Sequence, residues 1–186
     1  MYIVTLDTAR TSLVDMFLSA DNFEEYTCEQ EIIAGINVSN TFKLLKSISN
    51  TDVLILSIDC REYMHIEIHS EVKKTCTKFD LKLLDINENQ IEVPSMNMTT
   101  ITPMSSSDFQ RICRDMFNIG NDIEITRTGN TMKLYCSGDF ANQETTIQCI
   151  EESPEISGVY SLRYMNIFTK ATGMCSTVQI MQEDQN

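Results

Sequence analysis

A helix, a tight turn and a strand follow one another three times along the chain, and this pattern limits the possible folds more than any other feature. Apolar residues at helical spacing predict helices over residues 39–49, 107–118 and 161–172. Each is followed by a turn rich in Asn, Thr, Asp or Gly and then by a strand. Such a degenerate internal repeat indicates an α+β fold, in which helices cover one face of curved antiparallel sheets.

Alternation of apolar and polar residues predicts strands through most of the remaining sequence. The stretch from Leu81 to Met98 lacks clear periodicity beyond its first residues, and it reads as a connector between two similar halves. The expected division is therefore a domain over 1–80, a connector over 81–99 and a second domain over 100–186. The predicted strands are residues 3–6, 11–18, 53–58, 65–69, 123–126, 132–136, 145–150 and 177–181. The helix residues expected to face inward are Phe42, Leu45, Ile48, Phe109, Ile112, Cys113, Met116, Phe117, Leu162, Met165 and Phe168.

Charge is distributed unevenly. A net charge of −13 argues against a protein that coats nucleic acid with its whole surface. The three helical segments nevertheless carry six basic residues against Asp108 and Asp115, a net charge of +4 that leaves −17 for the rest. Within each helix the cations stand three or seven residues apart, so they share one solvent face. This predicts either a basic surface for sequence-independent phosphate contact or ordinary solvated helix faces, and charge alone does not separate the two. The cations are Lys43, Lys46, Arg111, Arg114, Arg163 and Lys170.

The cysteines and the overall hydropathy indicate a compartment. Seven cysteines occur without a CxxC pair, mostly among apolar neighbours, which predicts buried thiols in a reducing compartment. No stretch approaches the length of a membrane span, and the amino terminus has no basic region followed by an apolar run. We therefore expect a soluble intracellular protein.

Enzymatic motifs are not evident. His65 and His69 fall on one face of a predicted strand but roughly 13 Å apart, too far to share a metal, and we interpret them as surface residues. No Gly-rich phosphate loop or GxSxG motif is present. Asp85, Glu88 and Glu92 could form a metal or acid–base site, but an exposed acidic loop explains them more simply. The sequence thus predicts no enzyme, no cofactor and no metal site.

Four segments resemble the eukaryotic proliferating cell nuclear antigen (PCNA) family. Residues 109–116 with 118–121 resemble the family's central helix, and residues 162–172 with 176–178 are similar to its last inner helix. Another inner helix is matched by 35–38 with 43–46, and the interdomain connector by 81–94. Because these segments are collinear over nearly the whole chain, it is identified as a member of this family.

The resemblance implies a non-enzymatic DNA sliding clamp. Such a processivity factor has two similar domains per subunit, and three subunits form a homotrimeric ring that encircles duplex DNA with its helices lining the hole. It tethers DNA polymerase and repair enzymes through short peptides, works with a clamp loader, and acts in the nucleus, or at a viral replication site if virus-encoded. The six helix cations would face DNA, and Phe79 would lie in a subunit interface opposite residues 137–147. The client-peptide positions would be Leu6, Arg10, Leu13, Gln90, Ile91, Val93 and Pro94.

Some family features are missing. The sequence begins where the family is already in its second strand, and it stops before the closing strands of the second domain, so we expect both domains to be incomplete. Arg10, Thr11 and Met98 stand where the family usually has His, Val and Tyr. An alternative function therefore stays open: a truncated clamp-like module that binds client peptides or clamp subunits without encircling DNA.

Overall fold

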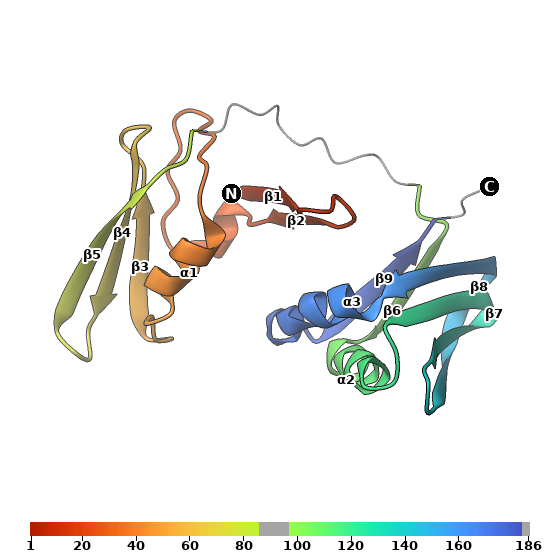
Figure 1. The fold of residues 1–186 in the computed structure, drawn as a ribbon. Helices are drawn as coiled ribbons and strands as arrows, with labels where there is room; N and C mark the ends of the chain where they lie inside the picture. The colour runs from red at the N-terminus through yellow and green to blue at the C-terminus, as the bar shows by residue number, and fades with distance from the viewer. Residues whose placement is uncertain (86–96, 184–186) are drawn as a thin grey trace. The chain divides into compact units, whose positions relative to one another are not determined.

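Antiparallel strand pairing organises the computed structural model, which describes residues 1–85 and 97–183 (Figure 1). The described residues form two units, the first containing residues 1–5 and 14–85 and the second residues 6–13 and 97–183. Helices and antiparallel sheets occur in both units, which confirms the predicted α+β class.

In the first unit, one three-stranded sheet in the order β3-β4-β5 carries most of the regular structure, beside a two-stranded hairpin of β1 and β2. Alternation alone did not predict β5, which extends to Lys82, two residues past the expected end of the first domain. The elements are β1 (Tyr2–Leu6), β2 (Leu13–Phe17), the 3-10 helix η1 (Ala20–Asn22), α1 (Val38–Leu45), β3 (Asp52–Ser57), β4 (Tyr63–Ser70) and β5 (Thr75–Lys82).

The core of this unit lies between the sheet and α1. Ile66 and Ile68 of β4 are buried with Leu81 of β5, because alternate residues of a strand point to the same face. Residues packed against them include Leu45 and Ile48, as predicted. The prediction for Phe42 is wrong, since its side chain is 64% exposed. The neighbouring Thr41 is buried instead.

The second unit contains two antiparallel strand pairs and the remaining helices. β6 pairs with β9, and β7 pairs with β8. Its elements are β6 (Thr100–Ser105), α2 (Ser106–Phe117), β7 (Asp122–Ser137), β8 (Asn142–Ser161), α3 (Leu162–Phe168), the 3-10 helix η2 (Thr169–Met174) and β9 (Thr177–Gln182).

One apolar face of α2 packs on β7. Most of the predicted inward residues of α2 are buried there, together with Leu162 of α3 and apolar side chains of β7. Phe117 and Phe168 were expected to face inward but are 46% and 40% exposed. Each is the last residue of its helix, and at about 100° per residue Phe117 is rotated roughly 80° from Phe109, at the margin of the apolar stripe.

A β-bulge joins two segments that alternation predicted as separate strands. β7 runs unbroken from Asp122 to Ser137, with register shifts on both sides of Gly129, which has a φ of 53°. The buried side chain of Arg127 donates hydrogen bonds to the backbone carbonyls of Gly129, Glu151 and Thr131, the last at 3.1 Å. Arg127 therefore supplies the donors that these carbonyls lose where the strand ladder is interrupted.

The cysteines differ from the prediction of mostly buried thiols. Cys113 and Cys136 are buried and Cys149 is partly buried, but Cys28, Cys60, Cys76 and Cys175 are exposed. All seven lie in the described residues and are free thiols. Within residues 1–85 and 97–183, no helix combines the length and apolarity that a membrane span requires.

Candidate nucleic-acid interface

α1 presents two lysines to solvent. Its N-cap Asn37 accepts a hydrogen bond from the backbone N–H of Asn40 at 3.0 Å and so begins the helix. Because Thr41 is buried and Leu45 packs on the core, Lys43 lies on the opposite, exposed face, and Lys46 follows at the helix carboxyl terminus. Cations in this position also interact favourably with the helix dipole.

α2 carries two arginines in different electrostatic surroundings. The guanidinium of Arg111 lies 3.4 Å from a carboxylate oxygen of Asp108 and 3.9 Å from one of Asp115. Arg114 is exposed, and no ion pair involves it among the described residues. α2 therefore has no net charge, and Arg114 is its more available cation.

Arg163 and Lys170 are exposed on consecutive elements. The predicted helix over 161–172 is divided, since α3 ends at Phe168 and the chain continues as the 3-10 helix η2. Arg163 therefore lies on α3 and Lys170 on η2. No acidic residue occurs in either element.

Side-chain amides place these elements beside α2, as the adjacent green and blue helices of Figure 1 show. Asn166 of α3 donates to the carbonyl of Cys113 at 3.2 Å, and Gln110 of α2 donates to the carbonyl of Thr169 at 2.7 Å. The second unit thus carries four of the six predicted cations in one helical layer. The other two, Lys43 and Lys46, belong to the first unit.

The arrangement suits phosphate binding and not base reading. Exposed Lys and Arg side chains attract the DNA backbone without carrying sequence information. None of the four cations in the second unit is buried. Such a layer can bind the DNA backbone in a nonspecific, salt-sensitive way.

Three of the seven predicted client-peptide residues lie in the described part of the chain. Leu6 ends β1 and is exposed, Arg10 lies in the following turn with a φ of 55°, and Leu13 begins β2. The others, Gln90, Ile91, Val93 and Pro94, lie outside the described residues.

Asp7 organises the turn that contains Arg10. Its carboxylate accepts hydrogen bonds from the hydroxyl of Tyr164 at 2.6 Å, from the N–H of Thr11 at 2.7 Å and from the N–H of Ser12 at 2.9 Å. The Tyr164 hydrogen bond, followed by those from the backbone amides, holds the pKa of Asp7 well below its usual range. Residues 6–13 are grouped with the second unit through such contacts.

Among the described residues, the two predicted subunit-interface strands each pair with one other strand. Within the described residues, β5 pairs with β4 alone and β8 with β7 alone. Phe79 lies on β5 and packs partly against the core of the first unit. Residues 137–147 form the turn between β7 and β8 and the first residues of β8.

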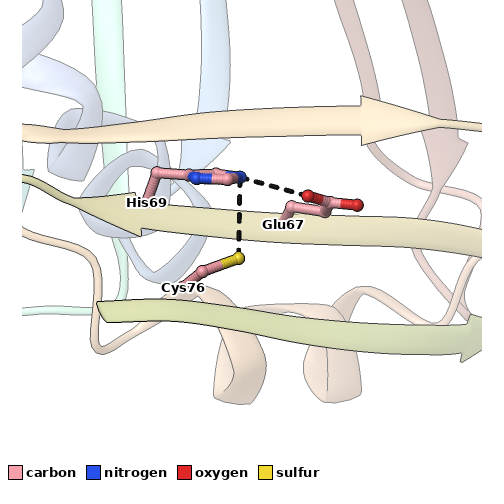
Figure 2. Close-up of side chains that lie close together, drawn as sticks. All are labelled: Glu67, His69 and Cys76. Atoms are coloured by element: carbon pink, nitrogen blue, oxygen red, sulfur yellow. Dashed lines mark hydrogen bonds and ion pairs between the residues drawn. The ribbon is translucent and has the colours of Figure 1, made fainter. Parts of the chain in front are cut away.

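Three side chains of metal-ligand type, which the sequence pattern did not predict as a group, lie close together. Glu67 and His69 on β4 and Cys76 on β5 bring one ligand atom each to within 4.8 Å of the others (Figure 2). The register of the β4–β5 hairpin would have predicted this group, because it makes His69 and Cys76 direct cross-strand partners across a short turn. His65 lies apart from this group, paired with Asp59 at 2.9 Å and Asp80 at 2.6 Å, as the interpretation of separate histidines requires.

Comparison with known proteins places both units in one family. The chain matches the model of the proliferating cell nuclear antigen N-terminal domain over residues 1–92 and that of its C-terminal domain over residues 92–186. It is 36% identical over 192 aligned residues to a protein described as probable DNA polymerase sliding clamp 1 of Paramecium bursaria Chlorella virus 1. That alignment covers 96% of this chain and 73% of the viral protein.

Proposed function

Because this chain belongs to the proliferating cell nuclear antigen family of DNA polymerase sliding clamps, we propose that its subunits close into a homotrimeric ring around duplex DNA and tether a polymerase to it. A clamp is a non-enzymatic processivity factor, so its function depends on surfaces and not on a catalytic group. The viral relative favours a virus-encoded clamp that acts at a site of DNA replication.

The observation that carries the proposal is the exposed basic layer of an otherwise acidic chain. α2, which carries Arg111 and Arg114, is joined through Gln110 and Asn166 to η2 and α3, which carry Lys170 and Arg163. The remainder of the chain outside the helical segments has a charge of −17, which repels DNA from other faces. Lys43 and Lys46 of α1 extend the same role to the first unit.

Client proteins would bind near the β1–β2 turn. We propose that short peptides of polymerases and repair enzymes contact Leu6, Arg10 and Leu13 together with Gln90, Ile91, Val93 and Pro94. The Asp7 hydrogen bonds support this assignment by fixing the turn in one conformation, which lowers the entropic cost of binding. A clamp loader would open the ring.

A charge-reversal experiment tests DNA contact. Replacing Arg111, Arg114 and Lys170 with Glu should abolish the binding of duplex DNA at low salt, measured by fluorescence anisotropy. For the parent, the logarithm of the binding constant should fall with the logarithm of salt by about 0.9 for each phosphate neutralised. Exposed cations off the helices give a control with the same change in net charge: Arg61, Lys73 and Lys82 replaced with Glu. Equal loss in both triple variants would mean that only total charge matters and would reject the helix assignment.

Light scattering and retention on circular DNA test the ring. We expect a trimer that stays on nicked circular plasmid and slides off once the plasmid is linearised. Phe79→Asp, at the unpaired edge strand β5, should give monomers, whereas Ile33→Asp, another apolar residue that is 71% exposed, should not. A folded monomer at high concentration that binds client peptides would favour the alternative, a clamp-like module that does not encircle DNA.

A further inference from the structure

The β4–β5 hairpin gathers three different metal-ligand side chains on the face of the sheet opposite its core. Glu67 and His69 stand two residues apart on β4, so they share a face, and the intervening Ile68 is buried on the other. Cys76 is the direct partner of His69 on β5. Cross-strand partners have Cβ atoms about 4.5–5.5 Å apart, which brings both side chains to one point without backbone movement.

The two separations from His69 are close to those of a tetrahedral zinc site. His69 Nε2 lies 3.1 Å from Glu67 Oε2 and 3.7 Å from Cys76 Sγ, the two dashed contacts of Figure 2. Zinc bonds of about 2.0–2.1 Å to nitrogen or oxygen and about 2.3 Å to sulfur place tetrahedral ligands roughly 3.3 Å (N and O) and roughly 3.6 Å (N and S) apart. The ligand atoms of Glu67 and Cys76 lie within 4.8 Å of each other, and one ion would require them to be roughly 3.6 Å apart, a change that side-chain rotation can supply.

We propose that Glu67, His69 and Cys76 bind a Zn²⁺ ion that fastens β4 to β5. A thiolate with an imidazole favours zinc over Mg²⁺ or Ca²⁺, which take oxygen ligands. The side chains of His69 and Glu67 are 43% and 28% exposed and Cys76 is exposed, so a fourth position is open to water or to an added ligand.

Neighbouring side chains orient the carboxylate of this site. Lys78 Nζ lies 2.6 Å from Oε1 of Glu67, and this pairing leaves Oε2 directed at His69. Such hydrogen bonding of a ligating carboxylate is common around bound metals. The lysine charge also opposes a cation, so Lys78→Gln should alter the affinity without removing the site.

Metal titration of the full chain tests the proposal. After EDTA treatment under phosphine reductant, the chain should bind one Zn²⁺ in competition with a chromophoric chelator. Co²⁺ should give a thiolate-to-cobalt charge-transfer band. Cys76→Ser should remove that band, and both Cys76→Ser and His69→Gln should weaken zinc binding by at least about tenfold. Circular dichroism of each variant checks that the chain still folds.

Matched controls separate this site from adventitious binding. Cys175→Ser removes another exposed thiol and His65→Gln the other histidine, and neither should change the zinc affinity or the cobalt band. Zinc should also slow the alkylation of Cys76 more than that of Cys28, Cys60 or Cys175, followed by mass spectrometry. No binding, or equal losses in the control variants, would overturn the proposal.

Discussion

The side-chain amide of Asn166 donates one hydrogen bond to the carbonyl of Cys113 at 3.2 Å and another to the carbonyl of Leu162 at 2.8 Å. It therefore joins α3, which carries Arg163, to the middle of α2, which carries Arg111 and Arg114. The Cys113 carbonyl lies inside α2 and already accepts a backbone hydrogen bond, so the Asn166 amide donates to the second lone pair of that carbonyl oxygen.

Replacing Asn166 should destabilise the second unit. We expect Asn166→Ala to lower the free energy of unfolding by about 1–2 kcal/mol, because two partly buried hydrogen bonds are lost. Asn166→Asp should cost more, since it directs a carboxylate at two carbonyl oxygens. Urea unfolding followed by circular dichroism measures both, and a midpoint unchanged in the Asp variant would contradict this role.

Removing acidic residues from α2 should strengthen DNA binding. Asp108→Asn with Asp115→Asn frees Arg111 from both ion pairs and changes the charge of α2 from zero to +2. A carboxylate near 8 Å from a DNA phosphate in water repels it by about 0.5 kcal/mol, so each one removed should raise the affinity roughly twofold. The gain should shrink at high salt. Anisotropy titrations at two salt concentrations measure it, and Glu152→Gln with Glu155→Gln, exposed residues off the helices, gives the comparison.

Arg127 should contribute strongly to stability. Its guanidinium donates to three carbonyls around the Gly129 bulge and is 2% exposed. Arg127→Met keeps the length of the side chain but leaves those acceptors without donors, so we expect a loss of about 2–4 kcal/mol in urea unfolding. The exposed Arg163→Met should change stability by less than about 0.5 kcal/mol. Similar effects of the two substitutions would rule out the bulge-fastening role.

Exposed thiols should react with alkylating reagents faster than buried thiols. Burial raises the pKa of the Cys113 thiol to about 12. This thiol therefore stays protonated at pH values well above about 8.5, the ordinary pKa of a cysteine. At pH 8.5 the exposed Cys28, Cys60 and Cys175 should react with iodoacetamide, and Cys113 only after unfolding in urea. Mass spectrometry of each peptide gives the rates. Fast labelling of Cys113 in the folded chain would show that the α2 core opens readily.

The turn at Asp7 should weaken in acid. A carboxyl whose pKa is lowered on folding stabilises the folded state above its unfolded pKa, and this contribution falls as the pH drops toward the folded pKa. The stability difference between the parent and Asp7→Asn should therefore be full at pH 6 and smaller at pH 3. Tyr164→Phe removes the hydrogen bond that lowers the pKa of Asp7 most. The stability difference between the parent and this variant should therefore also be smaller at pH 3 than at pH 6. Thermal unfolding at the two pH values provides the measurement, and a difference independent of pH would count against the assignment.

Features that repeat with the period of a helix or strand can be predicted from the amino-acid sequence. Helical spacing places Phe109, Ile112, Cys113 and Met116 on one side of α2 and Arg111 and Arg114 on the other, so core and basic surface both follow from local geometry. The family assignment also rests on local motifs such as residues 162–172. These features can be predicted from sequence because each depends on residues that are close together in the chain.

Features that depend on pairing between distant residues are seen only in the folded chain. Register alone places Cys76 beside His69, and the bulge at Gly129 makes one strand from two predicted segments. The direction of Phe42, away from the core, depends on how α1 packs on its sheet. Periodicity within one segment fixes which residues share a face, but the partner that each face meets is set by strand register and helix packing, which no single segment encodes.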